Sequence, residues 1–294
     1  MSEQVARLTE IALDDLVEAV GWLGRGVLRP VVRLAGRRPA RQFAEEVAAF
    51  DQQVARDGLV AAARSLLARH VGSLQVRRLA AFPAQGPVLI VANHPGLTDA
   101  LALIVAMGDD ALILVAADRP FFRALPHTLP SLLLVPDDGS GRIGAFRAVA
   151  RRLAEGRRVA TFPSGTIDPD PLLHADAFSR TAGWSRQLTA LRLRLPALSI
   201  VPVAIGGVLT RGALRHPLAR LYRPGPQRER AAAMLQVVDP RLRPAAVRLV
   251  VGPPLAGTEP EQVAQAYSEL ASALRAERDW SEALGSKSQP AASR

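Results

Sequence analysis

Apolar and polar positions in the first 75 residues follow a helical period. From Val5 to Val20 the apolar residues recur every three or four positions and the acidic residues lie off that stripe, which predicts an amphipathic helix. Arginines then recur at every fourth position from Arg25 to Arg41, and Pro30 is expected to kink or break a helix in this stretch. A third helical pattern runs from about residue 42 to residue 70. We therefore expect residues 1–75 to form an N-terminal helical segment.

From residue 76 the pattern changes to short, continuously apolar runs that alternate with helical stretches. Strands are predicted at residues 88–93, 111–117, 131–136, 158–163, 198–207 and 246–252. Helices are predicted between them at residues 98–107, 144–155 and 178–192. Strands that are apolar throughout are buried on both faces, so we expect an α/β fold with a mostly parallel sheet flanked by helices.

The last part of the sequence contains one further helix signal. Thr258 and Glu261 have the spacing of a capping box, which predicts that a terminal helix begins there. The Pro- and Arg-rich residues 210–243 show no clear pattern, and the polar residues 284–294 are expected to be a disordered tail. Residues 76–283 are therefore expected to form one α/β domain behind the N-terminal segment.

The chain carries a formal net charge of +10, almost all of it from arginine, and Lys287 is its only lysine. A basic protein can bind nucleic acid, an anionic membrane surface or an acidic small molecule. Aromatic residues make up only 4% of the sequence and are not interleaved with basic runs, which argues against the stacking platforms of proteins that bind nucleic acid. We therefore expect no nucleic-acid partner.

The sequence contains no cysteine, which excludes disulfide bonds and thiolate-based metal sites and is typical of a cytoplasmic protein. The first residues are acidic and lack the basic and apolar regions of a signal peptide. No apolar run approaches the roughly 18 residues needed to cross a bilayer. Any membrane contact is therefore expected to be peripheral, on the inner face of the cell membrane.

A histidine and an aspartate lie five positions apart after the first buried strand. Pro95 and Gly96 favour a turn directly after His94. Thr98 has the side chain of an N-cap, which would put Asp99 in the first turn of a helix. If the two side chains converge, Asp99 can accept the Nδ1–H of His94 and leave Nε2 free to take a proton from a hydroxyl or amine. The structural alternative is that His94 caps the helix and Asp99 only complements its dipole.

This pair belongs to a series of four sequence blocks. They are NHPGLTD at 93–99, FPSGT at 162–166, IVPVAIGG at 200–207 and VRLVVGPPL at 247–255. In this order they resemble the N-H-x-x-x-x-D block, the F-P-E-G-T block, the following I-P-V strand and the G-x-P ending of the glycerolipid acyltransferase family. The best-known members of that family are the 1-acylglycerol-3-phosphate acyltransferases. The resemblance extends from about residue 76 to the terminal helix.

The resemblance implies an enzyme that moves a fatty acyl group from an acyl-CoA or acyl carrier protein thioester to a hydroxyl, or an amine, of a lysophospholipid-like or other lipid acceptor. By this resemblance His94 would be the general base and Asp99 would orient it, without a metal or a cofactor other than the donor. Backbone N–H groups around Gly165 and Thr166, or at residues 96–99, would stabilise the oxyanion. The candidate substrate-binding residues are Asn93, Gly96, Arg142, Arg147, Pro163, Ser164, Gly165 and Thr166.

Two places depart from the family pattern. Members that acylate a phosphorylated glycerol usually carry an arginine after the third strand, where this chain has Asp137 and Asp138. In the second block Ser164 replaces the family's glutamate and Ile167 replaces an arginine. These losses argue against lysophosphatidate as acceptor, unless the glycine-rich loop at 139–147 binds the phosphate through its N–H groups and arginines. Otherwise the acceptor carries no phosphate, or the protein is a catalytically weak acyltransferase-fold protein that binds lipid or a partner.

The glycine-rich loop also has the G-x-G-x-x-G spacing of a dinucleotide-binding oxidoreductase, with Gly139, Gly141 and Gly144 between a predicted strand and a helix. That fingerprint needs an acid about 20 residues later, at the end of the next strand, to hold a ribose. Glu155 is too early and Asp168 too late, so this alternative is disfavoured.

The remaining acids and histidines show no second motif. Asp168 and Asp170 stand beside prolines, which predicts a turn rather than a metal site. The other histidines are predicted to be surface or packing residues: His70, His127, His174 and His216.

A lipid substrate requires a route to the membrane, and the N-terminal arginines offer one. If they form a ridge on a helix, they would meet anionic headgroups beside an aromatic side chain. The alternative is an ordinary solvated helix face. The candidate membrane-surface residues are Trp22, Arg25, Arg29 and Arg33.

Overall fold

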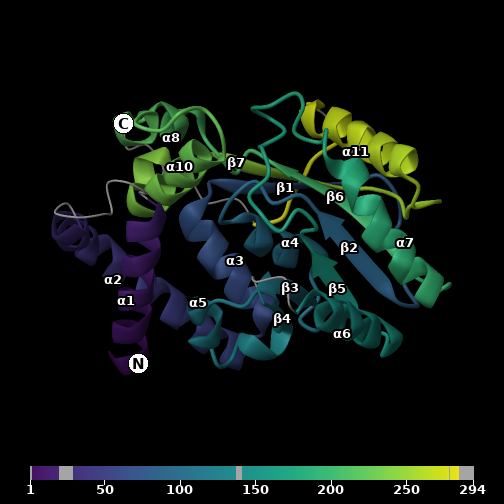
Figure 1. The fold of residues 1–294 in the computed structure, drawn as a ribbon, viewed down its shortest axis with the longest axis horizontal. Coiled ribbons are helices and arrows are strands. Elements are labelled where there is room, and N and C mark those ends of the chain that lie inside the picture. The colour runs from purple at the N-terminus through teal and green to yellow at the C-terminus, as the bar shows by residue number, and fades with distance from the viewer. Residues whose placement is uncertain (1, 20–28, 137–140, 278, 285–294) are drawn as a thin grey trace, which may run out of the picture.

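The computed structural model describes residues 2–19, 29–136, 141–277 and 279–284 (Figure 1). Within these ranges one sheet contains the strands β1 (Ser73–Arg78), β2 (Val88–Ala92), β3 (Ile113–Ala117), β4 (Leu132–Val135), β5 (Arg158–Thr161), β6 (Ser199–Gly206), β7 (Ala246–Val251) and β8 (Ser281–Glu282). Their order is β4-β3-β5-β2-β6-β7-β1-β8. Neighbouring strands are parallel except at β6–β7 and β1–β8. The predicted fold class is confirmed, and each predicted strand lies within two residues of its observed bounds.

Helices surround the sheet (Figure 1). The described α-helices are α1 (Ser2–Ala19), α2 (Arg29–Asp57), α3 (Leu59–His70), α4 (Asp99–Met107), α5 (Pro120–Arg123), α6 (Arg142–Ala154), α7 (Ser185–Arg194), α8 (Arg211–Arg215), α9 (Pro217–Arg220), α10 (Pro226–Val238) and α11 (Pro260–Arg275). Short 3₁₀ turns occur at η3 (Leu129–Ser131), η4 (Thr181–Trp184) and η5 (Pro240–Leu242).

The central strand β2 shows why apolar runs predicted this architecture. Successive side chains of a strand point to opposite faces of the sheet. Val88, Ile90 and Ala92 pack with α3 and α4 on one face. Leu89 and Val91 pack with α6, α7 and α11 on the other face, and every residue of β2 is buried. A strand covered on both faces must be apolar at every position, which is the pattern of residues 88–92.

The helix break predicted at Pro30 stays a prediction, because residues 20–28 lie outside the described ranges. Pro30 lies in the first turn of α2, where its missing N–H has no partner to lose, and the helix continues to Asp57. A break between α2 and α3 occurs at Gly58, which has a φ of +88°. A side chain there would also meet the carboxylate of Asp110, with Cβ 2.7 Å from Oδ1. Glycine at this position therefore separates α2 from α3.

The predicted terminal helix is present as α11, but two predicted helix starts differ in detail from the structure. The stretch at 178–192 begins with η4, and α7 starts only at Ser185. The N-cap of α11 is Glu259 rather than Thr258. The Thr258 hydroxyl instead accepts a hydrogen bond from Thr189 of α7 at 2.8 Å. Its burial against that helix replaces the predicted capping box with a tertiary contact.

The predicted division between residues 75 and 76 falls inside β1, which pairs in parallel with β7. Sequence reasoning did not predict β1, because polar residues alternate along it, and it did not predict the two-residue β8. α3 shares the core on one face of the sheet with α4, where Leu67 and Leu103 are fully buried. The division into an N-terminal segment and an α/β domain stays a prediction, and residues 285–294 of the predicted tail lie outside the described ranges.

Residues 207–245 form a cluster of short helices after β6, containing α8, α9, α10 and η5. Small side chains dominate its core, including Ala213, Ala219 and Ala232, each with no exposed surface. In Figure 1, α8 and α10 lie together at the upper left. Side chains of this size allow short helices to approach closely, although they give no strong hydrophobic pattern in the sequence.

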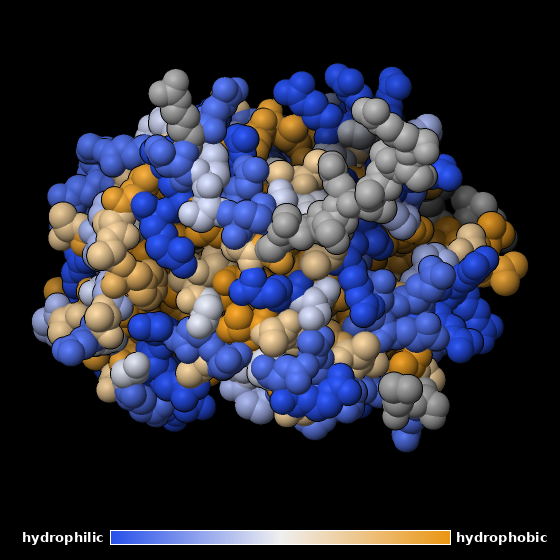
Figure 2. Space-filling model, turned by 180° about the vertical axis from the view of Figure 1, so that it is seen from behind, coloured by the Kyte–Doolittle hydropathy of each residue, from blue (hydrophilic) through white to orange (hydrophobic). Residues whose placement is uncertain are grey.

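The described surface is mostly polar. On the face shown in Figure 2, hydrophilic side chains are interspersed with small hydrophobic groups. None of the helices within the described ranges is both long and apolar enough to cross a membrane. At the start of α2, Val31 and Leu34 are 60% and 77% exposed, so this helix begins with apolar side chains in contact with solvent.

Candidate active site

The site begins at the carboxyl end of β2, where Asn93 fixes the chain. The Asn93 amide donates from Nδ2 to the Ile205 carbonyl at 2.9 Å, and its Oδ1 accepts the Ile205 N–H at 2.8 Å. Its side chain thus joins the end of β2 to β6, and the residue is only 1% exposed. Asn93 was predicted to bind substrate, but its amide is engaged by backbone. His94, the next residue, therefore leaves the sheet from a fixed point.

The side chains of His94 and Asp99 meet. The distance from His94 Nδ1 to Asp99 Oδ2 is 2.7 Å, and Asp99 is fully buried. The same carboxylate accepts the N–H of Gly96 at 3.0 Å and that of Ala100 at 2.7 Å. With three partners, the carboxylate is held in one orientation. If Nδ1 carries the proton, Nε2 is unprotonated and can act as a base.

The turn between the two residues is close to the predicted one. Thr98 occupies the N-cap position of α4, but its hydroxyl makes no capping hydrogen bond. Asp99 closes the turn instead, by binding the N–H of Gly96. Gly96 is buried, and a Cβ there would lie 2.7 Å from Cγ1 of Val208. The turn therefore depends on glycine because of crowding from the segment that follows β6.

Opposing effects set the proton affinity of His94. Burial lowers the pKa of His94, but the charge and hydrogen bond of Asp99 raise it, and the charge of Asp168 raises it further. The balance places the pKa above the ordinary value of 6.5. The His94 side chain is 30% exposed, so a substrate hydroxyl can approach it. A group with such a pKa is suited to take and return a proton near neutral pH.

The loop after β5 forms the second wall of the site. The ring of Phe162 packs against His94, with 4.9 Å between ring centroids. A tight turn follows, in which Gly165 donates its N–H to the Phe162 carbonyl at 3.1 Å and has a φ of +64°. Pro163 is half-buried, whereas Gly165 and Thr166 are exposed. The structure therefore brings the two predicted blocks together at one edge of the sheet.

Asp168 is the site residue that sequence reasoning missed. Its Oδ2 accepts the backbone N–H of His94 at 2.8 Å and the Ser164 hydroxyl at 3.0 Å. Its own N–H donates to the His94 carbonyl at 2.7 Å. The sequence predicted only a turn here. The sequence alone carried no signal for this role, because the pairing of β5 with β2 that brings Asp168 to His94 is a feature of the fold.

Two of the candidate substrate-binding residues lie elsewhere or are only partly described. Arg147 is exposed on α6 and lines a separate hollow with Arg151 and Arg194, between α6 and the end of α7. Arg142 begins α6, but its side chain lies outside the description, as do residues 137–140 with Gly139. The described structure therefore does not bring Arg147 together with His94.

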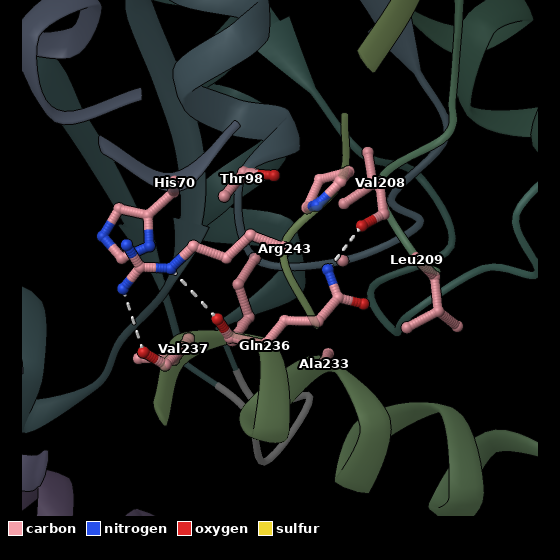
Figure 3. A pocket seen from close by; sticks show the side chains of 11 residues that line it. His70, Thr98, Val208, Leu209, Ala233, Gln236, Val237 and Arg243 are labelled. Atoms are coloured by element: carbon pink, nitrogen blue, oxygen red, sulfur yellow. Dashed lines mark hydrogen bonds between the residues drawn. The ribbon is translucent and has the colours of Figure 1, made fainter. Parts of the chain in front are cut away.

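A small pocket lies against the turn between His94 and Asp99 (Figure 3). Gly96 and Thr98 line one side of it, and Gln236 and Arg243 line the other. Gln236 Nε2 donates to the Val208 carbonyl at 2.9 Å, while Arg243 donates to the carbonyls of two residues of α10. The volume of the pocket, about 20 Å³, is enough for a water molecule and too small for an acyl chain. The pocket thus belongs to the support of the turn.

Two of the four predicted membrane-surface residues are described. Arg33 forms ion pairs with Glu10 and Asp14 of α1, and Arg29 Nη2 lies 3.9 Å from Asp14 Oδ1. These arginines therefore join α2 to α1 instead of forming a free basic ridge. Trp22 and Arg25 lie outside the described residues. In the described part of the chain, no group of three histidine, aspartate or glutamate side chains is arranged to hold a metal ion.

Comparison with known proteins finds a family model that is similar to part of this chain. A family model described as acyltransferase matches residues 73–206, a span that includes His94, Asp99 and the loop to Asp168. The chain is also similar to the crystal structure of the 1-acyl-sn-glycerophosphate (LPA) acyltransferase PlsC from Thermotoga maritima, with 15% identity, a TM-score of 0.40 and 81% of each chain covered. A search of curated proteins finds no match. The family-model match covers 134 of the 294 residues, and over this span the chain is similar to the acyltransferase family.

Proposed function

We propose that this protein transfers a fatty acyl group from a thioester of CoA or acyl carrier protein to a hydroxyl or amine of a lipid acceptor. The observation that supports this most strongly is the 2.7 Å contact between His94 Nδ1 and the buried Asp99, within the acyltransferase-family segment. The family match also favours acyl transfer over the dinucleotide-binding alternative at Gly139, Gly141 and Gly144.

The proposed reaction uses His94 as base and then as acid. Asp99 holds Nδ1–H, so Nε2 removes the proton of the acceptor hydroxyl as the oxygen attacks the thioester carbonyl carbon. The tetrahedral intermediate collapses with cleavage of the carbon–sulfur bond. Nε2 then returns the proton to the departing thiolate, which leaves as free thiol, and an ester remains on the acceptor. The two substrates and His94 supply every proton and bond, so the proposal includes no cofactor.

The oxyanion needs a donor near His94, and two of the expected N–H groups already have partners. Gly96 donates to Asp99, and Gly165 donates to the Phe162 carbonyl. The N–H of Thr166 has only a long 3.5 Å contact with the Ser164 hydroxyl. Thr166 is therefore the stronger candidate of the loop, and a preorganised donor contributes about 10²–10³ in turnover.

The acceptor is proposed to reach the site from a membrane surface, with the protein peripheral on the inner face of the cell membrane. Exposed Val31 and Leu34 at the start of α2 support this contact. Ser164 and Ile167 stand where phosphate-binding family members carry charged side chains, so the assay must include acceptors with and without a phosphate.

The test is acyl transfer by purified wild type and His94→Ala. Palmitoyl-CoA and palmitoyl-loaded acyl carrier protein are each incubated with lysophosphatidate, lysophosphatidylethanolamine and monoacylglycerol, and products are identified by mass spectrometry. We expect a new acylated lipid with wild type and none above background with His94→Ala. Identical products from both proteins would contradict the proposal and favour a lipid- or partner-binding protein with weak catalysis.

A further inference from the structure

Asp168 joins two segments that are distant in sequence. Its carboxylate accepts the His94 N–H at 2.8 Å, while its own N–H donates to the His94 carbonyl at 2.7 Å. Both backbone groups of the histidine are thus held by one residue. The imidazole is held separately, by Asp99. Because backbone and ring are fixed by different carboxylates, Nε2 has little freedom to move.

The sheet explains why these residues meet. β5 pairs in parallel with β2, so the loops that follow the two strands leave the same edge of the sheet side by side. Phe162 packs on the His94 ring near the start of the second loop, and Asp168 binds the His94 backbone near its end. The loop from 162 to 168 therefore encloses His94 from one side.

Ser164, which replaces the glutamate of the resembled family block, lies next to Asp168. The F-P-S-G-T block has a serine where the resembled block has glutamate, so a carboxylate is missing at position 164. The Ser164 hydroxyl lies 3.0 Å from Asp168 Oδ2 and can donate to it. A carboxylate is thus present in the same loop, four residues later and adjacent to His94.

Asp170 provides an internal comparison. It lies two residues further on and is fully buried. Its carboxylate accepts the N–H groups of Leu172, Gly207 and Leu209, so it holds the end of β6. No hydrogen bond to His94 is found for it. The same loop therefore carries one aspartate that contacts the candidate base and one that supports the fold.

We propose that Asp168 is a positioning residue for the acyl transfer: it fixes the His94 backbone and places a second carboxylate next to that backbone. This inference rests on the proposed function. Asp168 occupies the loop position from which a carboxylate can act on His94 without touching substrate, with the Ser164 hydroxyl 3.0 Å from its Oδ2 and 2.8 Å from the Thr166 carbonyl.

The electrostatics are consistent with this role. The charged groups that act on His94 are Asp99, which binds its ring, and Asp168, which binds its backbone, and both raise the pKa of His94. Burial raises the pKa of Asp168 itself, while its bonds to the His94 N–H and the Ser164 hydroxyl lower it. We therefore expect removal of the Asp168 charge to lower the pKa of His94.

The test compares Asp168→Asn with Asp170→Asn, which changes the same side chain in the same loop. For Asp168→Asn we expect kcat to fall by about 10- to 100-fold, because small misplacement of a base is costly. KM for the donor should change by less than about twofold, since the residue acts through His94 and not on the substrate. The acid limb of the kcat/KM profile should move to lower pH. For Asp170→Asn we expect a lower melting temperature and an unmoved acid limb.

A second readout does not depend on catalysis. NMR titration of histidine-labelled protein gives the pKa of His94 directly, with His94→Ala used to assign the signal. We expect a lower pKa in Asp168→Asn than in wild type and no change in Asp170→Asn. If wild type shows no acyl transfer while this shift is present, the proposed function fails and the positioning contact stands. An unmoved His94 pKa in Asp168→Asn, or an equal shift in both variants, would overturn the inference.

Discussion

Asp99 has two roles, and the sequence predicted only the first of them, its contact with the His94 ring. It binds the imidazole of His94 and also accepts the N–H of Gly96, which closes the turn between the two residues. The turn brings His94 next to Asp99, and the Asp99 carboxylate in return stabilises the turn. At the scale of single residues, the candidate site is therefore a set of shared hydrogen bonds around one buried carboxylate.

Asp99→Asn should separate the effect of the Asp99 charge on His94 from the effect of the size of its side chain. The amide keeps the size of the side chain but removes the charge that raises the pKa of His94. We expect kcat to fall by about 10²–10⁴, because the ring loses its oriented tautomer. The acid limb of kcat/KM should also move to lower pH, since neutral His94 then persists in more acidic solution. Asp109→Asn, beyond the other end of α4, is the control and should leave the profile unchanged.

Gly96→Ala should damage the site by crowding. The added Cβ would lie 2.7 Å from Cγ1 of Val208, so the turn must shift. We expect lower kcat and a lower melting temperature. The double variant with Val208→Ala removes the opposing methyl groups and should recover much of the lost activity. Additive losses across the four proteins of this cycle would show that the crowding argument is wrong.

At the scale of elements, the site depends on where strands end. β2, β5 and β6 lie side by side and parallel, so the segments after them meet at one edge. Asn93 joins the first of these ends to β6, and Asp168 joins the first to the second. Open α/β sheets bind ligands at this edge, where loops from several strands contribute side chains.

Asn93→Ala should weaken this connection. The change leaves the N–H and the carbonyl of Ile205 without the partners they have in the amide of Asn93. Each buried group that loses its partner costs about 1–3 kcal/mol, so the free energy of unfolding measured with urea should fall by that order. Gln53→Ala removes an amide that makes an exposed hydrogen bond on α2 and should cost much less. Equal losses would contradict the role of Asn93.

At the scale of the whole molecule, the proposed membrane contact would combine net charge with local apolar surface. The chain has a formal net charge of +10, but Arg33 is bound to Glu10 and Asp14 within the protein. The exposed Val31 and Leu34 are therefore better candidates for lipid contact than the paired arginine between them. For the described residues, we therefore propose Val31 and Leu34 as the lipid contact in place of the predicted arginine ridge.

Vesicle co-sedimentation tests that view. We expect binding to vesicles that contain phosphatidylglycerol to fall as salt rises, because screening weakens attraction of a basic protein to anionic lipid. The double variant Val31→Ser, Leu34→Ser should bind less at every salt concentration. The matched control is Leu193→Ser, because Leu193 lies near the end of α7 and is 79% exposed. Equal binding by wild type and the double variant would exclude α2 as the lipid contact.

Local sequence determined the parts of this protein that local chemistry controls. The apolar runs predicted the six strands from β2 to β7 because a strand buried on both faces must be apolar throughout. The turn after His94 follows from Pro95, because the residue before a proline avoids the helical region, and α4 begins at Asp99 with Thr98 at its N-cap position. The meeting of His94 and Asp99 follows from that turn.

The tertiary structure decided what depends on strand neighbours and on packing. Asp168 reaches His94 only because β5 lies beside β2, and a single sequence does not state which strands pair. Thr258 fails to cap α11 because its hydroxyl binds Thr189, a partner 69 residues away. In both cases the side chain is polar, and the local sequence allows it several hydrogen-bond partners. The partner that binds it is chosen by the fold, because burial makes an unmatched polar group costly.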